Sequence, residues 1–140
     1  MFAQGTAGSK IFQGLRRLDI GNSNWQAVAM SRWTGDGTSN TYPRLTSNDT
    51  NGNFGKMSDF YLENGDYLRL KVVQLGYSLP SSVYSKIGLS KLRVYVSAEN
   101  LLTITKYTGY DPEIGGGVFG IDKGVYPQAR SLMLGVQLQF

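Results

Sequence analysis

Few residues in this sequence have the type and spacing that catalysis requires. The 140-residue chain contains neither histidine nor cysteine, which excludes His-based triads, Cys nucleophiles, disulfides, and zinc sites built on thiolates or imidazoles. Asp111 and Glu113 flank Pro112, but two carboxylates beside a proline in a loop are typical of solvated turn residues, not of a glycosidase pair. We therefore expect no enzyme, no catalytic residue and no cofactor or metal site.

The segment 115–120, GGGVFG, matches the pattern G-x-G-x-x-G of dinucleotide sites. Such a site needs a buried strand before the glycines and a helix after them, so that the phosphate meets the helix N-terminus. Here DPEI precedes the glycines and IDKGV follows them, which is loop sequence. The interpretation we favour is a loop tip without nucleotide binding.

The segment 49–53, DTNGN, is similar to the start of an EF-hand calcium loop. Phe54 stands where that loop needs glycine, and Phe60 stands where it needs glutamate. An Asn/Gly turn cluster is the favoured interpretation, and a loose calcium site is the alternative.

Large aromatic residues in the loops are the more suggestive candidates. Exposed tryptophan and tyrosine side chains stack on sugar rings or fill pockets of a partner. The alternative is that they pack the loops together or form a membrane-interface belt. The candidate ligand or partner contacts are Trp25, Trp33, Tyr42, Tyr107 and Tyr110.

The last ten residues, SLMLGVQLQF, alternate between apolar residues and polar or small ones. A period of two predicts a strand with one apolar face. Ten residues span about 33 Å, or about 23 Å when tilted by about 45°. That length is close to the apolar band of an outer-membrane barrel, about 25 Å tall, although a strand of a soluble β domain has the same pattern.

Two further strands are predicted at 67–79 and 91–102. In the first, Leu68, Leu70 and Val72 alternate with charged residues, and the phase then changes at Val73, which indicates either a β-bulge or a rim where a lipid-facing side begins. The second has Leu92, Val94 and Val96 on one face and charged residues on the other. Residues 1–4 are compatible with the tail of a fourth strand.

The connections between these strands run long, short, long. Residues 13–66 and 103–128 are rich in glycine and polar residues, and 80–90 form a short link with one helical turn. One short helix is predicted at 25–33, with Asn24 as its cap. Three full strands cannot close a barrel, so we expect the chain to be a piece of something larger or to pair with other copies.

The sequence does not have the features of a helical membrane protein, of a chain that begins with a signal peptide, or of a nucleic-acid-binding protein. No run approaches the roughly 20 apolar residues of a membrane-spanning helix, and no signal peptide follows Met1. The net charge of +4 is spread along the chain, so it does not predict a nucleic-acid partner.

Three segments carry a family resemblance: YLRLKVVQLGYSLP at 67–80, LRVYVSAENLLTITKYTGYDPE at 92–113 and GVYPQARSLMLGVQLQF at 124–140. They resemble the C-terminal portion of SusC/RagA-like TonB-dependent outer-membrane transporters of Bacteroidota. The segment WQAVAMSRWTGDGTSNTYPR at 25–44 resembles an extracellular loop of that family with its short helix. The combination of NLLT, KYTGYDPE and VYPQ-R is the most specific part of the match.

The resemblance implies an all-β fold in which residues 1–140 form the C-terminal part of a transmembrane barrel of about 22 antiparallel strands with a plug. It implies long extracellular loops, TonB-powered import of glycans, peptides or similar nutrients, and a SusD-like surface lipoprotein as partner. The plug, the TonB box and the signal peptide would lie outside this chain, which could not transport alone. A terminal aromatic such as Phe140 resembles the signal read during barrel assembly. No family site residues carry over to this region.

The expected orientation has the C-terminus and the 80–90 link on the periplasmic side. The apolar rows then face lipid, namely Leu92, Val94, Val96, Leu132, Leu134, Val136 and Leu138. Arg93, Glu99, Gln137 and Gln139 face the lumen. The alternative from another class is a soluble β-rich carbohydrate-binding module that stacks sugars on Trp25, Trp33 and Tyr110.

Overall fold

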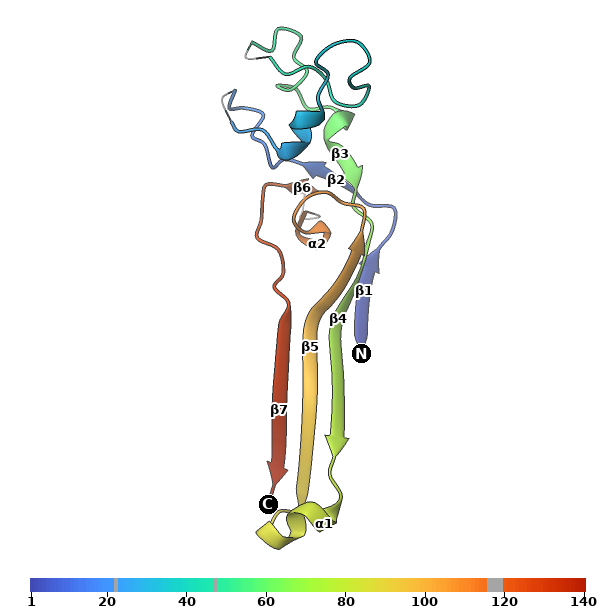
Figure 1. The fold of residues 1–140 in the computed structure, drawn as a ribbon, viewed down its shortest axis with the longest axis vertical. Helices are drawn as coiled ribbons and strands as arrows, with labels where there is room; N and C mark the ends of the chain where they lie inside the picture. The colour runs from blue at the N-terminus through green and yellow to red at the C-terminus, as the bar shows by residue number, and fades with distance from the viewer. Residues whose placement is uncertain (22, 47, 116–119) are drawn as a thin grey trace. The chain divides into compact units, whose positions relative to one another are not determined.

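A computed structural model describes residues 1–21, 23–46, 48–115 and 120–140. The chain divides into two compact units (Figure 1). We call residues 1–8, 66–106 and 127–140 the strand unit, and residues 9–65 and 107–126 the loop unit.

The strand unit is one antiparallel sheet with the order β1-β4-β5-β7. Its strands are β1 (Phe2–Thr6), β4 (Tyr67–Ser78), β5 (Lys91–Thr105) and β7 (Ser131–Gln139) (Figure 1). All four expected strands are therefore confirmed. The one that differs most in extent is β5, which runs three residues beyond the predicted Leu102.

The short link between β4 and β5 is the predicted helical turn. It consists of α1 (Ser81–Tyr84) and the 3₁₀ turn η3 (Ser85–Ile87). Gly88 ends the turn with φ of 73°, a left-handed conformation that glycine adopts without steric cost. The Ser90 amide then donates to the Gln139 carbonyl at 2.7 Å, so the link leads directly into the β5–β7 pair.

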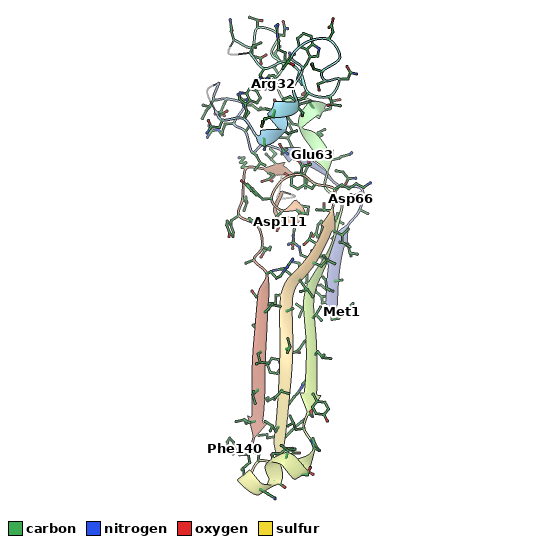
Figure 2. All side chains as sticks on the ribbon, viewed as in Figure 1. Met1, Arg32, Glu63, Asp66, Asp111 and Phe140 are labelled. Carbon is green, nitrogen blue, oxygen red and sulfur yellow. The ribbon has the colours of Figure 1, made fainter. Side chains whose placement is uncertain are left out.

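The register between β5 and β7 pairs apolar residues with apolar residues on one face of the sheet. Directly paired residues of an antiparallel sheet lie on the same face. One face carries the pairs Leu92–Leu138, Val94–Val136, Val96–Leu134 and Ala98–Leu132. The other carries Arg93–Gln137, Tyr95–Gly135 and Glu99–Ser131. The sequence prediction of one apolar and one polar face is confirmed, and side chains project from the sheet on both sides (Figure 2).

A register shift lies between Leu70 and Val72 in β4, just before the phase change that the sequence places between Val72 and Val73. Before the shift Leu70 pairs with Leu102, and after it Leu75 pairs with Val96. Lys71 is the extra residue relative to β1, whose Phe2 and Ala3 pair with Val72 and Leu70. Apart from Val72, which pairs with Glu99, the aliphatic residues of β4 face apolar residues of β5 on both sides of this irregularity, as a β-bulge allows.

Glycines on the polar face leave room for large neighbours. A Cβ on Gly135 would collide with the Tyr95 ring, and a Cβ on Gly76 would lie 2.6 Å from the Arg93 guanidinium. Both glycines are paired with Tyr95 across the sheet. Their missing side chains therefore let one aromatic and one cationic side chain lie flat over the strands.

The loop unit contains a small second sheet that the sequence pattern did not predict. Its order is β3-β2-β6, from β3 (Leu62–Asn64), β2 (Lys10–Gln13) and β6 (Ile121–Asp122). β2 pairs with β3 antiparallel and with β6 parallel. Three short helical turns complete it: η1 (Ala27–Ser31), η2 (Asp59–Tyr61) and α2 (Pro112–Gly115).

The helix predicted at 25–33 is shorter and of a different type. The structure has only the 3₁₀ helix η1, with Gln26 rather than Asn24 at its N-cap and no side-chain cap. Its end has a physical cause, since Arg32 is already extended and the Trp33 amide donates to the Tyr42 carbonyl at 2.8 Å. The amphipathic pattern of the two tryptophans reflects loop packing rather than an α-helix.

None of the helices among the described residues is long and apolar enough to cross a membrane.

Candidate functional site

An aromatic cluster forms the interior of the loop unit. Phe54 is its centre, only 3% exposed, with ring centroids of Trp25, Tyr42 and Phe60 at 4.7, 5.9 and 6.3 Å. Tyr61 contacts Phe60 at 5.2 Å and its hydroxyl donates to the Phe54 carbonyl at 3.1 Å. Edge-to-face contacts of this kind stabilise beyond simple area burial, so the loops have a packed core of their own.

Arg16 lies against this cluster. Its guanidinium carbon is 3.8 Å from the centroid of the Trp25 ring, a distance at which a cation is attracted by the ring's negative face. A terminal nitrogen donates to the Gly21 carbonyl at 3.2 Å. The Nε atom is buried without a hydrogen-bond partner among the described residues, and the aromatic face compensates part of that cost.

A first cavity, the aromatic cavity, lies beside Arg16 and has a volume of about 480 Å³. Its walls include Trp25, Tyr42, Phe60 and Tyr61. Burial raises the pKa of both the Tyr42 and the Tyr61 hydroxyl, so both remain neutral donors at ordinary pH.

Glu63, on the polar rim of the aromatic cavity, is hydrogen-bonded within the loop unit. The Glu63 carboxylate accepts from the Thr108 amide at 2.9 Å and from its hydroxyl at 2.7 Å. It also accepts from Gln13 Nε2 at 2.5 Å. These bonds connect the segments that contain Gln13, Glu63 and Thr108. Because they already occupy the carboxylate oxygens, Glu63 is not available to bind a cationic ligand.

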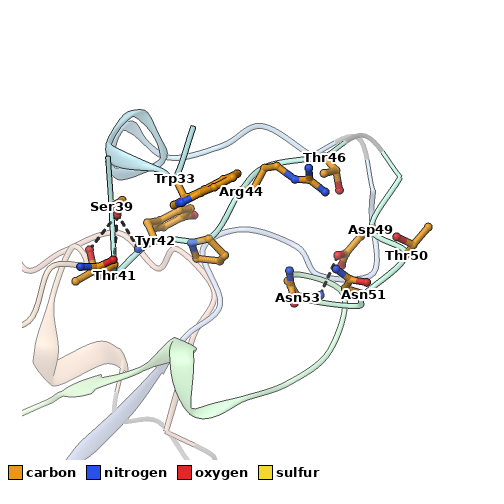
Figure 3. A pocket seen from close by; sticks show the side chains of 12 residues that line it. Trp33, Ser39, Thr41, Tyr42, Arg44, Thr46, Asp49, Thr50, Asn51 and Asn53 are labelled. Carbon is orange, nitrogen blue, oxygen red and sulfur yellow. Dashed lines mark hydrogen bonds between the residues drawn. The ribbon is translucent and has the colours of Figure 1, made fainter. Parts of the chain in front are cut away.

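A second cavity, the polar cavity, has a volume of about 420 Å³ (Figure 3). Trp33 and Tyr42 line one part of it, Asn51 and Asn53 line another, and Arg44 extends between them (Figure 3). The remaining lining residues are Ser39, Asn40, Thr41, Pro43, Thr46, Asp49 and Thr50. Aromatic rings, planar amides and hydroxyls in one cavity are a chemistry suited to a polar ligand with an apolar face.

Asp49 organises the loop of the EF-like segment. Its Oδ1 accepts from the Asn53 amide at 2.8 Å, and its Oδ2 accepts from the Phe54 and Gly55 amides at 2.8 and 3.0 Å. These backbone hydrogen bonds, that of Phe54 first, lower the pKa of the Asp49 carboxyl. The turn-cluster interpretation therefore fits, and the described residues contain no group of acidic side chains that could hold a metal ion.

Tyr107 and Asp122 form a buried pair in the loop unit. The Tyr107 hydroxyl donates to Asp122 Oδ2 at 2.6 Å, and the Gly124 amide donates to Oδ1 at 2.8 Å. Burial, followed by this hydrogen bond, raises the pKa of the Tyr107 hydroxyl well above its usual range. The pair fastens the 107–126 segment, whose Asp122 also belongs to β6.

The five aromatic candidates fall into different positions. Trp25 and Tyr42 line the aromatic cavity, and Trp33 and Tyr42 line the polar cavity. Tyr107 is only 7% exposed and serves the interior, whereas Tyr110 is 66% exposed and lines neither cavity. Sequence reasoning missed Arg16 and Arg44, because a cation's neighbours along the chain do not reveal which ring or amide it meets in space.

Two other sequence motifs are the glycine-rich segment 115–120 and the carboxylates beside Pro112. Most of the segment 115–120 lies outside the described residues. Asp111 Oδ1 accepts from the Glu113 amide at 3.0 Å, a local bond at the start of α2. Asp111 is thus engaged as a turn residue, as its position beside Pro112 predicted.

Comparison with known proteins shows that the chain is similar to part of several TonB-dependent receptors. It is 33% identical to TonB-dependent receptor P3 of Formosa agariphila over 150 aligned residues, which cover 100% of this chain and 14% of the receptor. It is 36% identical to TonB-dependent receptor SusC of Bacteroides thetaiotaomicron over 106 residues, covering 73% of this chain and 10% of SusC. The chain thus spans only a small part of the length of these relatives. No family model matches the sequence.

Solved structures agree with the sequence relatives. The RagAB peptide importer in its closed-closed state superposes with a TM-score of 0.76 at 31% identity, covering 99% of this chain and 15% of that one. The open-open state of the same importer gives a TM-score of 0.72 at the same identity and coverage. The similarity includes both the strand unit and the loop unit.

Proposed function

Because this chain belongs to the SusC/RagA-like TonB-dependent receptors of the outer membrane, we propose that it is the C-terminal part of a transporter that imports glycans, peptides or similar nutrients. In this proposal the strand unit is a section of a barrel wall, and the loop unit is extracellular. Energy from a TonB complex would enter through the part of the receptor outside this chain. A SusD-like surface lipoprotein would be the partner at the extracellular side.

The observation that carries the proposal is the exposed apolar face of the sheet. Leu75, Leu132 and Leu134 are 78%, 70% and 79% exposed. Val96 of β5 pairs with Leu75 of β4 on one side and with Leu134 of β7 on the other, so the apolar face continues across the three strands. A monomeric protein in water rarely leaves a continuous apolar surface of this kind. Lipid is the solvent that makes such a face favourable.

Strand length supports the same assignment. The nine residues of β7 span about 30 Å, or about 21 Å when tilted by about 45°. An outer-membrane barrel presents an apolar band about 25 Å tall. The fifteen residues of β5 leave a remainder that extends past such a band.

Connectivity supports the proposed orientation. Thr6, Tyr67 and Thr105 are paired at one end of the sheet, so both long connections depart from and return to that end. The short α1–η3 link closes the other end. Long connections are extracellular and short turns periplasmic in barrels of this class.

Import is tested by deleting the receptor gene in its own bacterium. Uptake of fluorescent oligosaccharides and oligopeptides is then compared with uptake by the parent strain and by a complemented strain. We expect one ligand class to lose uptake and to regain it on complementation, and the purified receptor to carry a surface lipoprotein detectable by mass spectrometry. Unchanged uptake of every class would refute the proposed function.

Orientation is tested by cysteine labelling of the intact receptor, since this chain has no cysteine of its own. Ser39→Cys in the loop unit should react with a membrane-impermeant maleimide on whole cells. Ser85→Cys in the α1–η3 link should react only after the outer membrane is permeabilised. The reverse pattern would invert the proposed topology.

The alternative of a soluble carbohydrate-binding module has lost its support. The similarity covers the strands as well as the loops that carry Trp25 and Trp33. A stacking role for these aromatics remains compatible with a receptor.

A further inference from the structure

The polar cavity combines an aromatic surface with a cation. Trp33 and Tyr42 come from two segments that the Trp33 amide joins to the Tyr42 carbonyl at 2.8 Å. Both rings are half-buried and line the cavity, and the exposed Arg44 side chain extends beside them (Figure 3). The backbone hydrogen bond holds the two aromatic residues on one wall before any ligand arrives.

The charge of Arg44 is not neutralised within the described residues. It has neither an ion pair nor a hydrogen bond among them. Asp49 is the one carboxylate that lines the cavity, and three backbone amides already occupy its oxygens. The Asp49 carboxylate stays charged, but it is held by these amides and forms no ion pair with the Arg44 guanidinium among the described residues.

The part of the cavity away from the aromatics is lined by polar side chains, in which Asn51 and Asn53 contribute planar amides and Thr50 contributes a hydroxyl (Figure 3). An amide can donate to one hydroxyl of a sugar and accept from the next. At about 420 Å³ the cavity falls within the range of small-molecule sites, roughly 300–1,000 Å³.

We propose that the polar cavity is a subsite for a sugar ring that bears a carboxylate or a sulfate group. The apolar face of the ring stacks on Trp33 or Tyr42, its hydroxyls meet the Asn51 and Asn53 amides, and its anionic group meets the Arg44 guanidinium. Arginine is suited to this role because its fork binds carboxylate and sulfate oxygens in pairs. This inference rests on the proposed import function, and it narrows the nutrient to an anionic glycan.

The test uses the purified intact receptor and calorimetric titration. The probes are oligogalacturonates, oligomannuronates and sulfated galacto-oligosaccharides, each beside its neutral counterpart, together with tri-alanine and tetraglutamate as peptides. We expect at least one anionic glycan to bind more tightly than its neutral counterpart. Arg44→Gln should weaken that glycan about tenfold or more and change the neutral one little.

Two further variants separate the roles of ring and charge. Trp33→Ala should weaken anionic and neutral glycans alike, and Trp33→Phe should restore most of the binding because an aromatic face returns. Arg130→Gln, which removes an exposed arginine outside the cavity, is the matched control and should bind as the parent does. Thermal melting of each variant confirms that the receptor is folded.

The inference is overturned if no anionic glycan exceeds its neutral counterpart, if Arg44→Gln binds as tightly as Arg130→Gln, or if the peptides alone bind and depend on Arg44. These results differ from failure of the proposed function, which appears as uptake that survives deletion of the gene. A receptor that imports nutrients yet ignores Arg44 would keep its function and lose this subsite.

Discussion

The strand unit and the loop unit differ in where their hydrophobic side chains lie: mostly exposed in the strand unit, and partly buried in an interior in the loop unit. Among the described residues, the strand unit buries only Tyr67 and Ala98 of its hydrophobic side chains, whereas the loop unit buries Ile11, Ala29, Phe54, Tyr61 and Tyr107. The strands carry their large aliphatic residues outward, and the loops collect their aromatics inward. The strand unit therefore depends on surroundings outside the chain, and the loop unit depends on its own interior.

This contrast predicts which kind of substitution lowers the stability of each unit. On the apolar face of the strands, polarity should matter and volume should matter little. In the loop unit, hydrogen bonds and packing should matter, and the membrane should be irrelevant.

The largest effect is expected for Val136→Arg in the intact receptor. Val136 lies near the middle of β7 on the apolar face, paired with Val94, and an arginine facing lipid near the midplane costs about 2–4 kcal/mol. Gln137→Arg, one residue along and on the opposite face, should cost much less. Guanidinium titration of the receptor in phospholipid vesicles measures both, and equal costs would break the distinction between the two faces.

The next effect is expected for Tyr107→Phe. This change removes the 2.6 Å hydrogen bond to the buried Asp122 carboxylate and should destabilise the loop unit by about 1–3 kcal/mol. Hydrogen exchange of the amides in residues 107–124 reports the change locally. Faster exchange spread into β7 would show that the two units are not independent.

The same tyrosine predicts a pH dependence. Its pKa is raised above the ordinary 10.0 in the folded chain, so the unfolded chain loses this proton first as the pH rises. The stabilisation is complete below about pH 10 and declines above it. The loop unit should exchange faster above pH 10 in the parent protein, and Tyr107→Phe should remove this contribution.

A smaller effect is expected for Gly135→Ala on the polar face. The new methyl group would meet the Tyr95 ring, and the displaced ring should cost about 1–2 kcal/mol. Tyr95→Ala in the same protein should relieve the clash. Gly21→Ala serves as control, because a methyl group there meets nothing within 4 Å; an equal loss at both glycines would contradict the packing argument.

The smallest effect is expected for Asp49→Asn. The amide keeps one acceptor oxygen but loses the charge that receives three backbone amides, so the loop around residues 49–55 should be weakened slightly. Because the folded pKa of Asp49 lies below 3.8, its stabilisation is present above that pH and is lost as the pH falls through the folded value. Hydrogen exchange of residues 52–55 between pH 5 and pH 2 measures both effects.

The strands could be predicted from the sequence because apolar and polar residues alternate along them with a period of two. Leu134, Val136 and Leu138 alternate with polar or small residues, and that pattern survives in the register with Val96, Val94 and Leu92. The phase change between Val72 and Val73 is visible for the same reason, although only the pairing of β4 with β1 and β5 shows that the register shift itself lies between Leu70 and Val72.

The loop unit could not be predicted in this way. Its parallel pair joins Phe12 to Ile121 across more than a hundred residues of sequence, and two-residue strands have no period to detect. The spacing of the apolar residues at 25–33 fits the period of an α-helix. The segment instead follows the contacts of Trp25 with Phe54 and of Trp33 with Tyr42, which come from other parts of the chain. The aromatic residues could be named as candidates, yet their sorting into two cavities required the fold.

The second sheet also brings the two ends of a long insertion together. The Gly65 amide donates to the Ser9 carbonyl at 3.0 Å, and Lys10 pairs with Asn64 immediately beyond, so the chain enters and leaves residues 10–64 at one point. A segment with adjoining ends can be exchanged between homologous receptors at little cost in loop-closure entropy. A graft would have to include residues 107–126, because β6 completes the same sheet. The architecture thus allows residues 10–64 and 107–126 to be exchanged together as one cassette while the strands of the strand unit stay unchanged.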